Sequence, residues 1–465
     1  MFFSTEHLQN VRVTIVGGGL AGCEAAYYLA SRSIPVTIAE MKPKKYTPAH
    51  ESPLLCELVC SNSLKSNDVY ANACGLLKQE MRLVGSLTME AAEFSAVPAG
   101  GALAVDREKF AAFVTEKLKS LPNVTVVEEE IEEIPEPSEN EYVFIATGPL
   151  TADALAADVE RKTGKNLHFF DASAPIVTAE SVDMTQAFTQ DRYDKGTGDY
   201  INCPMTKEQY YDFVENLLSA EKAMLHEFEK GEIFEGCMPI EVMASRGKDT
   251  LRYGTLKPVG LLQDGKRPYA VAQLRKENAD GSALGLVGFQ TNLRFPEQKR
   301  VFSMIPALKN AEFLRYGVMH RNSFIQSPVV LNNDFTFKYN ERVSFIGQLT
   351  GVEGYVESAA SGLFAAAYLY DKLTGNTRGT APQETVIGSL SAYLTTPNND
   401  FQPMNANFGI LPPLPVRIKD KKERYRALAE RSLSALQSWI ALGEEQPQEE
   451  QQSQATACED AQAEN

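Results

Sequence analysis

Long hydrophobic runs are missing from this sequence. It contains no stretch of about 18 consecutive apolar residues, and its first ten residues, MFFSTEHLQN, lack the basic start and apolar centre of a secretory signal. These absences argue against a membrane-spanning or exported protein and predict a soluble, cytoplasmic one. The 465 residues, of which 43% are hydrophobic and 23% charged, are ordinary for a globular chain with two or three domains.

Cysteine and histidine are scarce and irregularly placed. The seven cysteines are an odd number without framework spacing, which argues against a disulfide scaffold and favours a reducing compartment. The five histidines are scattered, and no Cys/His cluster has the spacing of a zinc site, so no metal is expected. A functional cysteine in this chain would therefore act as a thiol.

Basic residues are also fewer than acidic ones. The chain has 45 Lys and Arg and 61 Asp and Glu, which gives a net charge of -16. Taken alone, this charge argues against a nucleic-acid partner. Residues 444–465 hold seven of the acids and no Lys or Arg, and we expect this tail to be disordered. Residues 417–431 instead hold seven basic and three acidic residues at the expected start of a helix, which fits either a solvated helix face or a phosphate-binding one.

A dinucleotide-binding pattern stands near the amino terminus. The β-branched run VRVTIV (11–16) is followed at once by GGGLAGCEAAYYLA, which has helical periodicity and satisfies G-x-G-x-x-G. The second predicted strand, PVTIAE, ends in an acid placed to hydrogen-bond the adenosine ribose. The residues expected to hold the dinucleotide here are Gly17, Gly18, Gly19, Leu20, Ala21, Gly22 and Glu40.

Two later segments favour FAD over a nicotinamide as the resident dinucleotide. VFIATGPL (143–150) predicts a buried strand that ends at a second glycine turn, and VSFIGQLTGVEGYVESAASGLFAA (343–366) repeats the strand, glycine, helix order. A late glycine segment that brings the chain back to the cofactor is similar to the FAD domain of glutathione-reductase-like flavoproteins. The additional candidate residues are Thr147, Gly148, Gly347, Gln348, Gly351 and Gly354.

Residues 201–318 mix helical and strand-like pieces and interrupt this domain. We therefore expect an α/β protein with a discontinuous FAD-binding Rossmann domain (1–200 and 319–443), an inserted α+β substrate domain (201–318) and an acidic tail (444–465). Only one full fingerprint is present, which argues against a separate NAD-binding domain. NADPH or NADH would therefore dock transiently on the flavin. The sequence does not decide the oligomeric state.

A set of longer motifs identifies a family. They are VTIVGGGLAGCEAA, TPAHESPLLCELVCSNSLKS, LKQEMR, VPAGGALAVDREKF, ATGPLT, YINCPM, FEGCMPIEVMASRGKDTLRYGTLKPVGL, AQLRKEN, GFQTNL, EQKRVFSMIP, RYGVMHRN and GQLTGVEGYVESAASG. Together they cover about residues 11–366 and resemble the folate- and FAD-dependent tRNA (uracil-5-)-methyltransferases of bacteria. The resemblance implies conversion of the T-loop uridine of tRNA to ribothymidine, with methylenetetrahydrofolate as carbon donor and FAD, reduced by NADPH or NADH, as reductant.

The resemblance also assigns roles to individual residues. Cys237 would add to uracil C6, although composition alone makes a buried, space-filling cysteine the commoner case. Cys60 would lie near the flavin, either to help remove the C5 proton or to protect the flavin. His320 could contact the folate pterin or be an ordinary core histidine. Arg275 and Arg246 could hold folate glutamate or tRNA phosphate, or form ordinary salt bridges.

Three other functions stay open at the level of sequence. A related flavoprotein modifies the wobble uridine of tRNA, but that family is longer and FEGCMPIEVMASRG fits the methyltransferase. A flavin disulfide reductase could use Cys56 and Cys60, whose C-x3-C spacing is unusual for redox pairs. A catalytically idle flavoprotein that binds tRNA is the third.

Overall fold

The computed structural model describes residues 7–164, 167–194, 198–223, 238–398 and 401–444. Its first sheet has six strands in the order β16-β17-β7-β1-β2-β6, all parallel except β16. The strands are β16 (Thr336–Phe337), β17 (Asn340–Phe345), β7 (Glu141–Ile145), β1 (Arg12–Val16), β2 (Val36–Glu40) and β6 (Val124–Glu128). This is the doubly covered parallel sheet expected for a dinucleotide-binding domain.

The register of this sheet gathers the predicted cofactor residues at one edge. Val16 of β1 pairs with Ala39 of β2 and with Ile145 of β7, and Phe345 of β17 also pairs with Ile145. The four strands therefore end at the same level. Ligands of open α/β sheets bind at this carboxyl edge, where the loops following neighbouring strands diverge.

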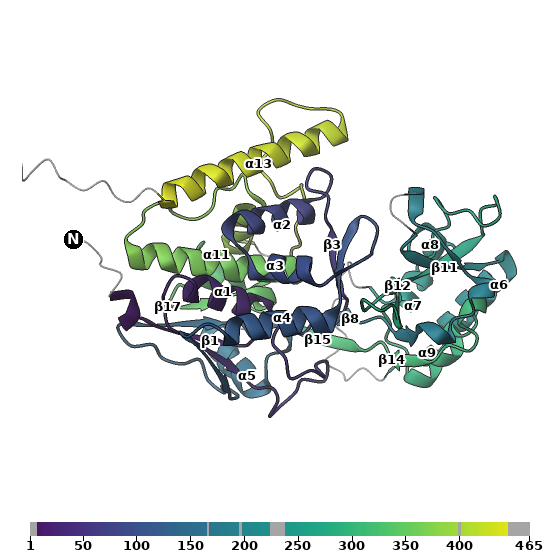
Figure 1. Ribbon diagram of the computed structural model, residues 1–465, viewed down its shortest axis with the longest axis horizontal. Helices are drawn as coiled ribbons and strands as arrows, with labels where there is room; N and C mark the ends of the chain where they lie inside the picture. Colours follow the sequence, from purple (N-terminus) through teal and green to yellow (C-terminus); the bar gives the residue numbers. More distant parts are fainter. Residues whose placement is uncertain (1–6, 165–166, 195–197, 224–237, 399–400, 445–465) are drawn as a thin grey trace, which may run out of the picture.

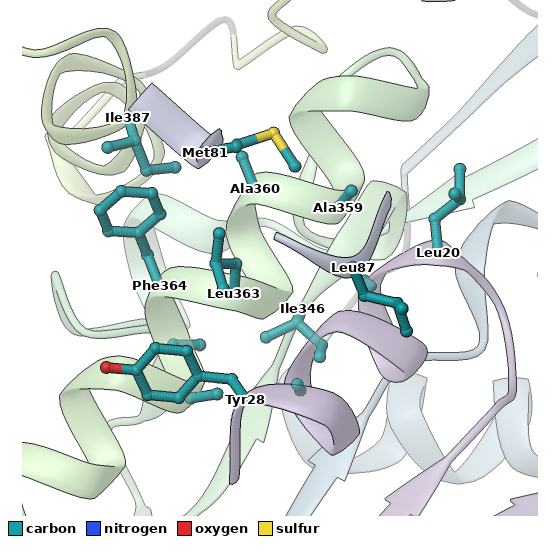
Figure 2. Packing of buried hydrophobic residues seen from close by; sticks show 14 of the residues in the cluster. Leu20, Tyr28, Met81, Leu87, Ile346, Ala359, Ala360, Leu363, Phe364 and Ile387 are labelled. Atoms are coloured by element: carbon teal, nitrogen blue, oxygen red, sulfur yellow. The ribbon is translucent and has the colours of Figure 1, made fainter. Parts of the chain in front are cut away.

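Both faces of the first sheet are buried. Val13 and Ile15 of β1 face one apolar cluster, whereas Val16 faces a second, as alternation along a strand requires. Figure 2 shows Tyr28, Leu363 and Phe364 packed together in the first cluster. The helices α1 (Leu20–Ala30) and α11 (Tyr355–Thr374) lie in contact there. Around them lie α2 (Ala73–Val84), α3 (Leu87–Phe94), α4 (Arg107–Lys119), α12 (Val386–Thr395) and α13 (Lys421–Glu444), while α5 (Asp153–Thr163) and α10 (Ser327–Val330) contribute to the second cluster.

A second sheet, entirely antiparallel, forms a separate unit at the right of Figure 1. Its order is β10-β11-β12-β13-β9-β14, and it has an apolar core of its own. Its strands are β9 (Ile176–Thr178), β10 (Phe188–Thr189), β11 (Tyr200–Met205), β12 (Ala270–Lys276), β13 (Ala283–Leu286) and β14 (Phe313–Arg315), and its helices are α6 (Lys207–Ser219), α7 (Ile240–Ser245), α8 (Thr250–Tyr253) and α9 (Phe295–Phe302).

The chain passes between the two units twice, once through β8 (Leu167–Ala172) and once through β15 (Met319–Phe324). This antiparallel pair lies between them in Figure 1. A small sheet of β3 (Ser63–Ser66), β5 (Ala102–Val105) and β4 (Ala96–Val97) also lies on this side of the first unit.

The second sheet begins earlier in the chain than residue 201, the start expected for the insertion. Both β9 and β10 precede that residue and belong to the second sheet. These strands have three and two residues, which is too short to show alternation in the sequence. Residues 445–465 of the expected tail lie outside the described residues. Within the described residues, no helix is long and apolar enough to cross a membrane.

Candidate cofactor and substrate site

The glycine turn after β1 leaves room for a ligand. Gly17 has φ +107°, and a Cβ built on it would lie 2.7 Å from the carbonyl oxygen of Ala146. A Cβ on Gly22 would lie 2.1 Å from the Gly17 carbonyl oxygen, so this glycine lets α1 pack closely on the turn. A Cβ on Gly19, by contrast, would meet no atom within 4 Å. Gly19 also begins α1 without a side-chain cap, so the helix start faces open space and can attract an anion.

Glu40 stands beside this turn at the end of β2. Its two carboxylate oxygens accept hydrogen bonds from the backbone N–H groups of Gly18, at 2.8 Å, and Lys42, at 3.0 Å. The carboxylate is thus fixed in orientation by backbone donors. It retains acceptor capacity for a further donor such as a ribose hydroxyl.

The late glycine segment closes the same edge of the sheet. Gly347 has φ +75°, and its N–H donates to the Ser361 hydroxyl at 2.7 Å. Gly351 has φ +91°, and a Cβ there would lie 2.7 Å from the Phe401 ring. Gly354, with φ +121°, precedes the first residue of α11. This segment therefore requires glycine for its backbone conformation, in addition to any contact with a ligand.

One open pocket joins these pieces. Of the residues predicted to bind or react with a ligand, those that line it are Gly17, Gly18, Gly19, Leu20, Ala21, Glu40, Cys60, Thr147, Gly148, Gly347 and Gln348. Gly22, Gly351 and Gly354 are absent from its described lining and serve the packing and turns given above. The pocket lies at the carboxyl edge of the first sheet, because the residues that follow β1, β2, β7 and β17 all line it.

Cys60 meets a tyrosine that the sequence did not single out. Its thiol donates to the hydroxyl oxygen of Tyr355 at 3.0 Å, and the backbone N–H groups of Cys60 and Ser61 donate to the same oxygen at 2.8 and 3.3 Å. Burial raises the pKa of the Tyr355 phenol well above its usual value, and the Cys60 thiol raises it further. Tyr355 therefore stays a neutral phenol, and its Oη lies within hydrogen-bond distance of the Cys60 Sγ in the wall of the pocket.

Several known proteins resemble this chain. A family model described as glucose inhibited division protein A matches residues 12–377. A protein of Acetivibrio thermocellus named methylenetetrahydrofolate--tRNA-(uracil-5-)-methyltransferase TrmFO is 52% identical over 433 residues, covering 92% of this chain and 98% of that protein. Proteins of the same name from Lactobacillus johnsonii and Staphylococcus haemolyticus are each 54% identical with the same coverage. This chain belongs to that methyltransferase family.

The fold is shared more widely than the family. A crystal structure of Aquifex aeolicus GidA aligns with a TM-score of 0.67 and 15% sequence identity, covering 94% of this chain and 76% of that one. At this identity the similarity shows the fold alone. It supports the α/β architecture with a parallel Rossmann-like sheet.

Arg275 of β12 reaches from the second unit to the segment that follows Cys60. Its Nη2 donates to Ser61 Oγ at 3.1 Å and to Asn62 Oδ1 at 2.6 Å, and it lies 3.9 Å from a Glu277 carboxylate oxygen. Its buried Nε has no hydrogen-bond partner in the described part of the chain. Arg275 thus joins the two units next to a residue of the pocket wall, and its contact with folate or tRNA stays a prediction.

The structure describes only part of the other residues predicted to act on the substrate, which are Arg246, His320 and Cys237. Arg246 is exposed and follows α7 directly. His320 lies on β15, paired in register with Asp171, and its side chain is outside the described part. Cys237 lies outside the described residues altogether. On either side of the undescribed stretch, Ala223 donates a backbone hydrogen bond to the Asn292 carbonyl oxygen and Ile240 donates one to the Gln290 carbonyl oxygen, each at 2.7 Å.

Asn322 of β15 is a pocket residue that the sequence gave no means of finding. Its side chain lines the cavity, the residue is only 2% exposed, and its Nδ2 has no hydrogen-bond partner among the described residues. A buried donor left without an acceptor costs about 1–3 kcal/mol. A ligand acceptor in the pocket would remove that cost, so Asn322 is a candidate contact for the bound molecule.

The remaining cysteines are deeply buried where the structure describes them. Cys23, Cys56, Cys74 and Cys203 are each at most 2% exposed. Burial raises the pKa of the Cys23 thiol well above its usual value, and its contact with Cys56 adds to this. Reactive thiols need the opposite environment.

Proposed function

We propose that this chain methylates C5 of the T-loop uridine of tRNA, with methylenetetrahydrofolate as carbon donor and FAD, reduced by NADPH or NADH, as reductant. The observation that carries the proposal is the 52–54% identity, over 92% of the chain, to proteins named for this reaction. The pocket supports it, because both Glu40 and the thiol-bearing Cys60 line the same site.

The residues of the pocket fit FAD. The open space in front of Gly19 and the uncapped start of α1 suit a pyrophosphate, and Glu40 suits the adenosine ribose. Thr147, Gly148 and the Gly347 segment would follow the rest of the cofactor, and the Asn322 Nδ2 is a donor that no described residue accepts from. When bound, FAD supplies the hydride equivalent that a methylene unit needs to become a methyl group. We accordingly infer a glutathione-reductase-like FAD domain.

The protein's own nucleophile would be Cys237. Uracil C5 is a poor nucleophile until a thiolate adds at C6 and makes the ring an enolate, and cysteine suits this step because its thiolate can leave again. Cys60, as a thiolate within 3.0 Å of the Tyr355 hydroxyl, would then take the C5 proton. Both catalytic assignments are proposals.

We propose that the second unit is the substrate domain. The second sheet starts at β9, so the insertion would begin near residue 173 and end near 318. Its Arg275 contacts Ser61 and Asn62, immediately after Cys60, and this contact brings the two units together beside the pocket. Domain junctions of this kind are preferred ligand sites.

The competing functions have less support. The GidA fold is shared, but its 15% identity is far below that of the methyltransferases. In a disulfide reductase the thiols of Cys56 and Cys60 would face each other, whereas here Cys60 contacts Tyr355 and Cys56 contacts Cys23.

The decisive experiment incubates the purified protein with an unmodified tRNA transcript, labelled methylenetetrahydrofolate and NADPH. We expect labelled ribothymidine, and none when S-adenosylmethionine replaces the folate. Methylation that needs S-adenosylmethionine and no folate would refute the proposal. Tight tRNA binding without methylation would favour the idle flavoprotein.

A further inference from the structure

Three aromatic rings form a parallel stack at one end of the second unit. The rings of Phe313 and Tyr316 have centroids 5.1 Å apart with planes 6° apart, and those of Tyr316 and Phe295 are 4.8 Å apart with planes 13° apart. Parallel rings at these centroid separations are offset-stacked, one of the two arrangements that aromatic pairs prefer. A run of three nearly parallel rings resembles the geometry in which nucleobases stack.

The stack lies outside the apolar core. Phe313 packs at the margin of the second unit's core, but neither Tyr316 nor Phe295 belongs to an apolar cluster of the described residues. Phe295 is 49% exposed. The last ring of the stack therefore presents apolar surface to solvent without a packing reason among the described residues.

The stack is held beside the wall of the pocket. Arg315, between Phe313 and Tyr316, donates to the carbonyl oxygens of Val59 and Ala49, each at 3.1 Å. Val59 lines the pocket next to Cys60. This places the aromatic rings one residue from a direct contact with the pocket wall.

On its other side the stack adjoins residues 290–294, which hydrogen-bond to residues 221, 223 and 240. The Arg294 N–H, just before Phe295, donates to the Glu221 carbonyl at 3.1 Å, and Ala223 and Ile240 both bind the segment 290–292. Gln298 of α9 fixes the geometry, because it exchanges hydrogen bonds with both the N–H and the carbonyl of Gly317. The rings thus occupy a rigid position between the pocket wall and the described residues that flank 224–237.

We propose that Phe295, Tyr316 and Phe313 form a stacking platform for an unpaired base of the RNA substrate, next to the base that enters the pocket. The proposal rests on the proposed function. An enzyme that acts on a base in a folded loop must unstack its target, and the neighbouring bases then lose stacking partners of their own. An exposed aromatic face can stack with any base in place of such a partner, and the exposed Lys299 nearby suits an accompanying phosphate.

The test measures binding of a T-arm RNA hairpin across a salt series, with 2-aminopurine in the loop to report stacking. Phe295→Ala should weaken binding by about 5- to 100-fold, as expected for loss of one base-aromatic stack, and should lower the quenching of 2-aminopurine. The slope of log affinity against log salt should not change, because no charge is removed. Phe295→Trp should retain wild-type binding, and Phe295→Leu should behave like Phe295→Ala.

The matched control is Leu314→Ala. Leu314 is 58% exposed and lies in β14 next to Phe313, but its side chain is not a ring of the stack. It should bind like wild type. Unfolding temperature and flavin content, measured on every variant, separate loss of the platform from loss of the fold.

The outcomes distinguish this inference from the proposed function. If wild-type protein neither binds nor methylates the RNA, the proposed function fails, and the platform fails with it. If wild type does both and Phe295→Ala binds as tightly with the same quenching, the platform alone is wrong. A change in sedimentation of Phe295→Ala without a change in RNA affinity would make the rings a contact between copies of the chain and would also overturn the inference.

Discussion

The three glycines of the G-x-G-x-x-G motif have different structural roles in this protein. Gly17 needs its positive φ, Gly22 lets α1 approach the turn, and Gly19 alone borders open space. Substitution at the first two would disturb the fold, whereas substitution at Gly19 would fill space that a ligand needs. Gly19 is therefore the position where binding and folding can be separated.

Gly19→Val should fold normally and lose FAD, because the new side chain would occupy the approach of the pyrophosphate to α1. The absorbance of the flavin in the purified protein and the unfolding temperature of the apoprotein measure the two effects. Gly101→Val is the control, since a Cβ there also meets no atom within 4 Å and the residue is away from the pocket lining. Full flavin content in Gly19→Val would contradict the assignment.

A trapped adduct can separate the roles proposed for Cys237 and Cys60. Cys237→Ala should abolish methylation while NADPH oxidation and the flavin spectrum persist. Wild-type enzyme should form a covalent adduct with tRNA carrying 5-fluorouridine, because fluorine cannot leave C5 as a proton, and Cys237→Ala should form none. Cys60→Ala should lose turnover and can still form the adduct if Cys60 acts after the attack. An adduct mapped to Cys60 would show that the nucleophile is misassigned.

At the level of elements, buried carboxylates join helices that are distant in sequence. Glu80 of α2 accepts hydrogen bonds from the N–H groups of Val386, at 2.7 Å, and Ile387, at 3.1 Å, at the start of α12. The hydroxyl of Ser432 in α13 donates to it at 2.6 Å. One side chain thus links three helices of the first unit, and burial raises its pKa to about 7 despite these donors.

The raised pKa of Glu80 predicts a pH dependence of stability. The folded protein would keep this proton up to about pH 7, whereas the unfolded chain loses it near the ordinary pKa of 4.5. The protonated Glu80 carboxyl therefore adds about 3 kcal/mol to the free energy of unfolding below pH 4.5. This stabilisation is lost as the pH rises through 7. Denaturant titrations between pH 4.5 and 7.5 should show this decline in wild type and a smaller one in Glu80→Gln. Glu384→Gln, just before the α12 cap, should decline as wild type does; equal slopes in all three would refute the assignment.

For the whole molecule, the distribution of charge matters more than its sum. The chain is strongly acidic, yet the basic residues 417–431 lead into and begin α13, which runs along the top of the first unit in Figure 1. Lys421 and Lys422 are exposed there. A local cationic surface can bind phosphates whatever the net charge of the protein.

Reversing both lysines, Lys421→Glu with Lys422→Glu, should weaken tRNA binding and reduce the slope of log affinity against log salt by about 1–2, since each phosphate contact contributes about 0.7–0.9. The control reverses Lys119 and Lys309, which are exposed elsewhere and change the net charge equally. Deletion of residues 444–465 should leave methylation intact or slightly strengthen binding. If the double variant binds as wild type does at every salt concentration, residues 417–431 are only a solvated helix face.

The sequence alone determined the features that depend on local pattern. The strand, glycine turn and helix from Arg12 to Ala30 and the acid at Glu40 follow from hydrophobic periodicity and the conformational freedom of glycine, which act over a few residues. The family followed from motifs spread over about residues 11–366. Parallel pairing then brings strand ends together, so the cofactor edge of the sheet was also predictable.

Only the tertiary structure decided which distant residues meet. Cys60 and Tyr355 are 295 residues apart, and Arg275 reaches Asn62 across 213 residues; no local period encodes such contacts. The Asn322 Nδ2, which has no partner among the described residues, and the stack of Phe295 on Tyr316 likewise exist only after packing. The early start of the second sheet was missed because β9 and β10 are too short to carry a pattern and gain their stability from neighbouring strands.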